Sequence, residues 1–302
     1  MTPTEDGPEQ VSGPSSVSQT SNSLKLRVFT ALVAVGISVS VLTVPLGGPV
    51  AVLIAAVIWA GAWELGDLFR WLGWTRFYAT LAVLLAMIGV VSISFTNPQE
   101  PSFVLGWTTL GTIVGAVFAA YFMKDDTPHP LSWLGILWLA CPLLSLVALH
   151  IWTKSTNPHP IYLAVFPIWA GDTAAYFVGK AFGKRKLAPA ISPKKTVEGG
   201  IANLLAAVAT TLIMAPYFGM NWVGALLIGL SAGVFGQAGD LFESYLKRKS
   251  GVKDSGSLLP GHGGILDRID SILFACIPSC WTLVFFAPHL FNVKQLAMGS
   301  LW

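Results

Sequence analysis

Apolar residues form about nine long runs along the chain, and a helix needs about 20 residues to cross the hydrocarbon core of a bilayer. The runs cluster near that length, so each predicts a transmembrane helix. Little more than Gly47 and Gly48 separates the first two, which also fit a tight helical hairpin. The runs are 27–45, 49–69, 77–95, 103–123, 131–151, 161–182, 201–219, 222–241 and 271–291.

The composition agrees with this pattern. Hydrophobic residues make up 54% of the 302 residues and charged residues only 11%, and the mean hydropathy is +0.66. A soluble domain carries about 25% charged residues. We therefore predict an all-α polytopic membrane protein with about nine transmembrane helices. Residues 1–24 are rich in Ser, Thr, Pro and Gly and lack the pattern of a cleavable signal, which predicts a disordered cytoplasmic tail.

The positions of Lys and Arg predict how the helices are oriented. With nine spans and a cytoplasmic start, only Lys154 and Lys294 of the 18 Lys and Arg residues fall on the outer side. The basic clusters at 180–195 and 247–268 then face the cytoplasm. We expect an inner or plasma membrane protein of bacterial type, with its polar loops where nucleotides are available. The net charge of +3 is small and no nucleic-acid-binding motif is present.

The most polar segment lies between the last two apolar runs. Basic residues open it, a turn rich in Gly and Ser follows, and acids close it. Such groups at a membrane boundary suit phosphate and metal chemistry on a lipid. A lipid-facing anchor would account for Lys247 to Lys249 but not for the acids or the glycines flanking His262. The candidate residues are Ser244, Lys247, Arg248, Lys253, Asp254, His262, Gly263, Gly264, Asp267, Arg268 and Asp270.

A second candidate group begins at Asp172, inside the sixth apolar run. An unpaired carboxylate there costs about 2.5–3.5 kcal/mol on insertion scales, so it must face protein, water or a cation. At helical spacing Tyr176, Gly179 and Gly183 share its face, and small residues let a backbone or ligand approach. A functional site is favoured over an interhelical hydrogen bond that only holds the bundle together.

The loop that follows carries hydroxyls and lysines before a predicted helix start near Glu198. Such groups, with N-terminal backbone amides, can hold a polyphosphate. Pro193 restricts the approach of Lys194 and Lys195, which makes them better triphosphate ligands than the basic residues at 184–186, whose charge fits a positive-inside signal. The candidates are Ser192, Lys194, Lys195 and Thr196.

A third group lies at the inner end of the eighth run. Asp240, Glu243, Ser244 and Lys247 are spaced by three, four and seven residues and so share one helical face. An ordinary surface pair would account for Glu243 and Lys247. Asp240 lies deeper in the apolar run and needs another explanation.

Together these segments resemble the phosphatidate cytidylyltransferase family, also called CDP-diacylglycerol synthases. The segment from Ser244 to Asp270 matches the pattern S-x-apolar-K-R, K-D, then H-G-G-apolar-x-D-R-apolar-D. The segment from Asp172 to Gly199 carries D-T-x-A-Y followed by S-P-K-K-T-x-E-G. The resemblance covers roughly residues 165–275.

This resemblance implies transfer of the cytidylyl group of CTP to phosphatidic acid, giving CDP-diacylglycerol and pyrophosphate. Magnesium would be the cofactor, and a second cation is left open. Asp240 and Asp267 are the first choices as ligands, and Asp172 and Asp270 the second. His262 is either an electrophilic donor or a structural pin of the turn. The phosphates would be shared by Lys194, Lys195, Lys247, Arg248, Lys253 and Arg268, with backbone amides near Gly263 and Gly264 and hydroxyls of Ser192, Thr196 and Ser244.

We expect residues 25–160 to be a transmembrane scaffold that contacts membrane lipids and is a candidate homodimer interface. Residues 161–292 form the predicted catalytic region, and 293–302 a short tail. Three other functions compete: a nucleotide-dependent transferase or kinase for another lipid, a secondary transporter, and a membrane scaffold without activity. A transporter predicts repeated halves, which the sequence does not show.

Overall fold

Helices make up almost all of the protein that the computed structural model describes, which is residues 36, 47–68, 89, 101–122, 136–153, 156, 159–259 and 263–291. Two short 3-10 helices, η3 (Ala215–Phe218) and η4 (Pro288–Phe291), follow α7 and α9. The α-helices are α2 (Gly47–Leu68), α4 (Pro101–Phe122), α5 (Ile136–Trp152), α6 (Ile161–Phe182), α7 (Val197–Met214), α8 (Trp222–Lys249) and α9 (Leu266–Phe286).

Each of these helices coincides with one of the predicted apolar runs. Within the described residues, four segments are long and apolar enough to cross a membrane: α6, α7 with η3, α8 and α9. The protein is therefore a helical membrane protein. Most of the predicted runs 27–45 and 77–95 and both predicted tails lie outside the described residues, so the count of about nine helices stays a prediction.

The loop between α6 and α7 differs from the all-helical prediction, because it contains a β-hairpin. Strand β1 (Lys186–Ala188) pairs antiparallel with β2 (Ser192–Thr196). The turn begins with Pro189, whose fixed φ suits this position, and it closes with a hydrogen bond from Ile191 N to Ala188 O (3.2 Å). Lys194 and Lys195, the lysines predicted to bind a polyphosphate, lie on β2, so the hairpin fixes their positions relative to α6 and α7.

Two of the helices that follow have side-chain N-caps, as their sequences favour. The Thr196 hydroxyl accepts from Gly199 N at the start of α7, and the Asn221 side chain accepts from Gly224 N at the start of α8. α9 differs, because Ile265 at its N-cap position provides no side-chain hydrogen bond. The first amides of α9 therefore need acceptors from elsewhere in the fold.

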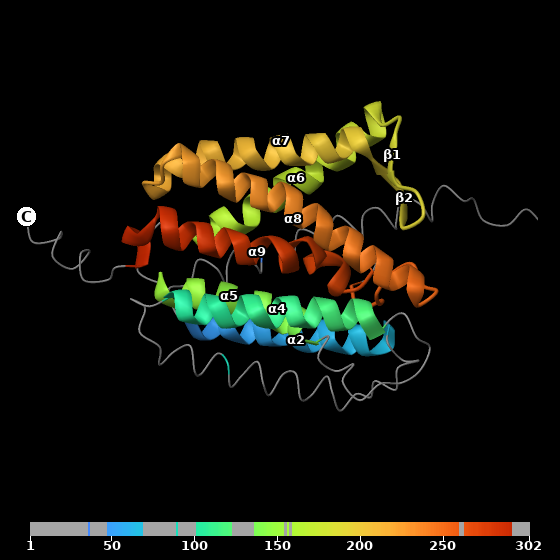
Figure 1. Ribbon diagram of the computed structural model, residues 1–302, viewed down its shortest axis with the longest axis horizontal. Coiled ribbons are helices and arrows are strands. Elements are labelled where there is room, and N and C mark those ends of the chain that lie inside the picture. The colour runs from blue at the N-terminus through green and yellow to red at the C-terminus, as the bar shows by residue number, and fades with distance from the viewer. Residues whose placement is uncertain are drawn as a thin grey trace, which may run out of the picture.

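Figure 1 shows α8 and α9 in the middle of the bundle, with α6 and α7 on one side and α2, α4 and α5 on the other. Glycines permit the closest approaches between helices. A Cβ on Gly199 of α7 would lie 2.9 Å from the carbonyl oxygen of Ala175 and 3.3 Å from Cα of Gly179, both on α6. A Cβ on Gly229 of α8 would lie 2.5 Å from Cα of Val208 on α7.

The α7–α8 contact gives a first prediction. Gly229→Ala would place a methyl group against the backbone of α7, and overpacking of this kind costs about 1–3 kcal/mol. We expect a lower midpoint of thermal unfolding for the purified protein in detergent. Gly106→Ala on α4 is the matched control, because nothing lies within 4 Å of the added methyl. Equal midpoints for the two variants would contradict the packing described here.

Candidate active site

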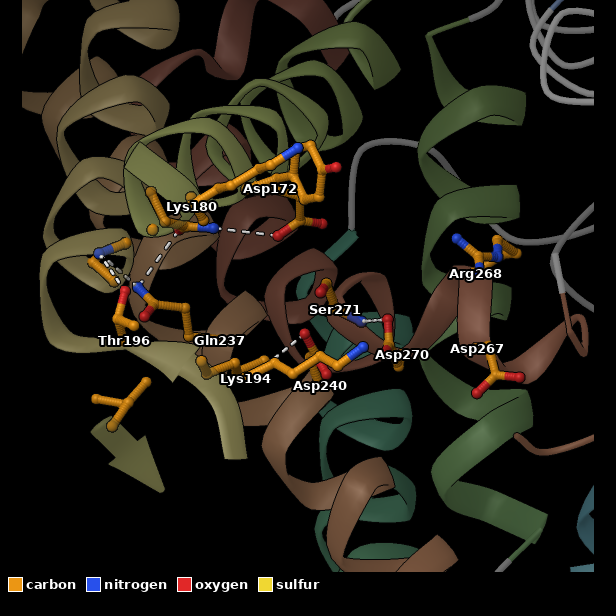
Figure 2. A pocket seen from close by; sticks show the side chains of 18 of the residues that line it. Asp172, Lys180, Lys194, Thr196, Gln237, Asp240, Asp267, Arg268, Asp270 and Ser271 are labelled. Carbon is orange, nitrogen blue, oxygen red and sulfur yellow. Dashed lines mark hydrogen bonds and ion pairs between the residues drawn. The ribbon is translucent and has the colours of Figure 1, made fainter. Parts of the chain in front are cut away.

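A cavity of about 780 Å³ lies where the polar parts of α6 to α9 and the hairpin meet. Figure 2 shows the side chains of these elements converging on it. Many of the residues predicted from sequence line its wall, although they come from separate segments of the chain. They are Asp172, Lys194, Lys195, Thr196, Asp240, Lys247, Asp254, Asp267, Arg268 and Asp270.

Other predicted residues do not line this cavity. Arg248 turns to the hairpin and the end of α8, where its Nε donates to Ile191 O (3.2 Å) and its Nη1 to Val252 O (2.8 Å). Ser244 is buried and donates to Oδ1 of Asp240 (3.4 Å). His262 lies outside the described residues. The remaining described candidates away from the wall are Ser192, Lys253, Gly263 and Gly264.

Three carboxylates from three helices form the acidic centre of the cavity: Asp172 of α6, Asp240 of α8 and Asp270 of α9 (Figure 2). Asp172 accepts from Nδ2 of Asn203 (3.1 Å), and Asp240 forms an ion pair with Lys195. Asp240 lies within electrostatic range of the other two. One ion pair offsets only part of this charge, so the centre attracts further cations.

No three His, Cys, Asp or Glu side chains in the described part of the chain converge closely enough to hold a metal ion by themselves. Magnesium, however, is bound in many enzymes by one or two carboxylates together with substrate phosphates and water. The acidic centre fits that second arrangement, because its carboxylates face a cavity that Lys194, Lys195, Lys247 and Arg268 also line.

Asp267 lies apart from the acidic centre (Figure 2), and both of its oxygens are engaged. Oδ1 accepts from Nζ of Lys247 at 2.5 Å. Oδ2 accepts from the backbone amides of Ser255 (3.0 Å) and Gly264 (2.8 Å). Asp267 thus holds two points of the loop between α8 and α9, Ser255 and Gly264, beside the wall of the cavity.

The pair Glu243–Lys247 is not the surface pair predicted from sequence. Nζ of Lys247 lies 2.6 Å from Oε2 of Glu243, but Glu243 is fully buried and Lys247 is only 8% exposed. The prediction was wrong because α9 packs over this face of α8 and adds Asp267 as a second partner of Lys247. One ammonium group therefore serves two buried carboxylates.

The family to which the chain belongs follows from comparison with known proteins. A model described as the cytidylyltransferase family matches residues 25–286. The chain belongs to the cytidylyltransferase family.

Curated bacterial relatives match a shorter part of the chain. It is similar to the phosphatidate cytidylyltransferase of Bacillus subtilis (strain 168), with 54% identity over 116 residues, 38% of this chain and 43% of that protein. Proteins of the same name from Staphylococcus saprophyticus and Staphylococcus aureus (strain COL) are 48% identical over 125 and 124 residues. Each of those two alignments covers 40% of this chain and 48% of the relative. The matched segments thus span about half the length of these relatives.

Two amide side chains that were not among the predicted site residues, Asn203 and Gln237, hold parts of the candidate site together. Asn203 is buried on α7 and holds Asp172, while Nε2 of Gln237 on α8 donates to Gly200 O at 3.1 Å and lies 3.4 Å from Oδ1 of Asn203. Together they link α6, α7 and α8 behind the acidic centre. The available signal was an amide side chain inside an apolar run, which requires a partner.

Three further residues near the cavity also escaped prediction. Tyr176 was considered only for its helical face, yet it lines the cavity with Lys180, whose Nζ lies 5.9 Å from the Tyr176 ring centroid. Glu64 of α2 is buried against the start of α9, where it accepts from the backbone amides of Ile265 and Leu266. Its sequence signal was a carboxylate at the end of an apolar run, and only the tertiary fold reveals its contacts.

The shared ammonium group gives a second prediction. Lys247→Met would leave Glu243 and Asp267 buried without their cation, and breaking a buried pair in this way costs about 3–5 kcal/mol. We expect a marked loss of stability in denaturant titrations of the detergent-solubilised protein. Adding Glu243→Gln to this variant should restore part of the loss, because one uncompensated charge is removed. The exposed Lys249, in the same helical turn, gives the control Lys249→Met; similar losses for both lysines would refute the buried pairing.

Proposed function

We propose that the protein transfers the cytidylyl group of CTP to phosphatidic acid, giving CDP-diacylglycerol and pyrophosphate for phospholipid synthesis. Membership of the cytidylyltransferase family and the names of the bacterial relatives support the reaction class. The observation that carries the proposal is the cavity itself, in which lysines, an arginine and carboxylates from four apolar helices and the hairpin meet.

The proposed reaction brings two strongly anionic groups together. A phosphomonoester has a second pKa of about 6, so it is largely dianionic near neutral pH and needs no strong general base. The obstacle is its repulsion by the triphosphate, together with the charge that develops on the departing pyrophosphate. Lys194 and Lys195 on β2, Lys247 on α8 and Arg268 on α9 all line the cavity, and Figure 2 shows Arg268 on the side away from Lys194. This placement suits a triphosphate on the hairpin side and a lipid phosphate on the other.

We further propose that Mg²⁺ binds at the acidic centre. Asp240 remains our first choice as a ligand, with Asp172 and Asp270 beside it and phosphate oxygens completing the coordination. Asp267, the other first choice from sequence, is the weaker candidate because lysine and backbone donors occupy both oxygens. A bound Mg²⁺ would offset the negative charge of the phosphates.

The location of the cavity suits a lipid substrate. Its lining residues lie toward one end of helices long enough to span a bilayer. The exposed face of α7 is apolar and carries Ile201, Leu205 and Ile213. We propose that the acyl chains stay in the bilayer beside these helices while the phosphate enters the cavity from the cytoplasmic leaflet. The nine-helix topology and a homodimeric assembly belong to this proposal.

The reaction is tested by pyrophosphate release from the purified protein in detergent with Mg²⁺, CTP and phosphatidic acid. We expect release that needs both substrates, stops in EDTA and returns with Mg²⁺. Asp240→Asn should lower kcat by at least about 100-fold, because it removes charge from the acidic centre while keeping the side-chain shape. A nucleoside diphosphate as product would instead indicate a lipid kinase. No turnover by folded wild-type protein would rule out these substrates.

The hairpin lysines give a separate prediction. Lys195→Met should raise KM for CTP by about 10–100-fold, since a charge-assisted hydrogen bond contributes about 1.5–3 kcal/mol. Lys186→Met is the matched control, because Lys186 is exposed on the neighbouring strand and does not line the cavity. An equal rise in KM for both variants would mean that the hairpin attracts CTP only through its net charge.

A further inference from the structure

The N-terminus of α9 is capped by a carboxylate from a distant helix. Oε1 of Glu64 on α2 accepts from the backbone amide of Ile265, and Oε2 accepts from that of Leu266, both at 2.9 Å. These amides have no acceptor within α9, and the positive end of the helix dipole favours a carboxylate. Glu64 therefore takes the place of the missing N-cap side chain at Ile265.

The same carboxylate is joined to Asp267 through Ser255. The Ser255 hydroxyl lies 3.0 Å from Oε2 of Glu64 and 3.0 Å from Oδ2 of Asp267. Asp267 in turn holds Lys247, which lines the cavity. The hydroxyl proton can be donated to only one of these carboxylates at a time, but the Ser255 backbone amide also donates to Oδ2 of Asp267 (3.0 Å). Ser255 therefore connects Glu64 of α2 with Asp267 at the wall of the cavity.

Two glycines provide the space that Glu64 occupies. A Cβ added to Gly256 would lie 2.6 Å from Oε1 of Glu64, and one added to Gly264 would overlap Oε2. Any larger side chain at these positions would displace the carboxylate or the loop. Gly264, the second glycine of the H-G-G pattern, therefore leaves the space that the Glu64 side chain of α2 fills. This steric observation does not depend on the hydrogen bonds.

We propose that Glu64 is a positioning residue for the reaction carried out in the cavity. By fixing the first amides of α9 and Ser255 of the α8–α9 loop, it sets the positions of Asp267, Lys247 and Arg268. It does not face the cavity, so it acts through these residues and not on a substrate. The catalytic part of this inference rests on the proposed cytidylyl transfer, whereas its structural part does not.

Glu64→Gln tests the proposal with little change in volume. It replaces one acceptor oxygen by an NH₂ group that faces a backbone N–H, so the two amides of α9 cannot both be satisfied. We expect kcat to fall about 10–100-fold, because small displacements of positioned groups have effects of this size. KM for CTP should change by less than about threefold, since the hairpin lysines lie outside this network. Hydrogen exchange of the full-length protein, followed by mass spectrometry, should show faster exchange in peptides covering 263–268.

Two serine variants complete the test: Ser255→Ala probes the same network, and Ser279→Ala is the matched control. Ser255→Ala should lower kcat in the same direction, and its effect should not add to that of Glu64→Gln because the two residues share one hydrogen bond. Ser279→Ala removes an equally buried hydroxyl of α9 that donates to Ala275 O within its own helix (2.8 Å). It should leave both kcat and exchange at 263–268 unchanged. If Glu64→Gln does not fold, Ser255→Ala carries the test.

Each outcome separates this inference from the proposed function. Wild-type kcat in folded Glu64→Gln overturns the positioning role, whether or not exchange at the start of α9 changes. A fall in kcat with unchanged exchange overturns it too, because Glu64 would then act by another route. If wild-type protein releases no pyrophosphate, the proposed function fails and the catalytic part of the inference with it. The exchange experiment then still decides whether Glu64 holds α9.

Discussion

Negative charge inside an apolar bundle is the constraint on which the rest of this structure depends. An isolated carboxylate in such a place costs several kcal/mol, so each one must be offset by donors or by cations. Glu64, Glu243 and Asp267 are offset within the protein by backbone amides, Ser255 and Lys247. Asp172, Asp240 and Asp270 are offset only in part and face the cavity. The first set holds the loop and helices in place, and the second leaves uncompensated negative charge that a bound Mg²⁺ would offset.

In the described part of the chain, the helices coincide with predicted apolar runs, because length and hydropathy determine them locally. The sequence also assigned Asp172, Tyr176, Gly179 and Gly183 to one helical face, because helical spacing is a local property. The first three of these residues line the cavity and Gly183 does not. The hairpin was missed because strands of three and five residues leave no periodic signal, and the Pro189 turn was interpreted only as a restriction. The burial of Glu243 depends on α9, which covers its face from elsewhere in the chain.

The sequence predicted that residues 25–160 are a scaffold and that residues 161–292 are the catalytic region, but Glu64 of the first part contacts the second part at the start of α9. The sequence supported that division because the family motifs lie in the second half. The structure joins the halves at a point where α2 provides the cap of α9, the helix that carries Asp267 and Asp270. A motif glycine can therefore serve a residue about 200 positions away, as Gly264 does for Glu64. Contacts of this kind are not visible in one sequence, because nothing local to Gly264 indicates its partner.

We propose that the acidic centre and the hairpin lysines form one site for a cation and a polyphosphate. The decisive measurement is thermal unfolding of the purified protein with Mg²⁺ alone, with CTP alone in EDTA, and with both together, because a ligand that binds the folded state raises its unfolding midpoint. We expect the combined shift of the midpoint to exceed the sum of the separate shifts, and this excess to disappear in Asp172→Asn. If CTP in EDTA shifts the midpoint as much as CTP with Mg²⁺, the acidic centre and the hairpin lysines do not form a joint site.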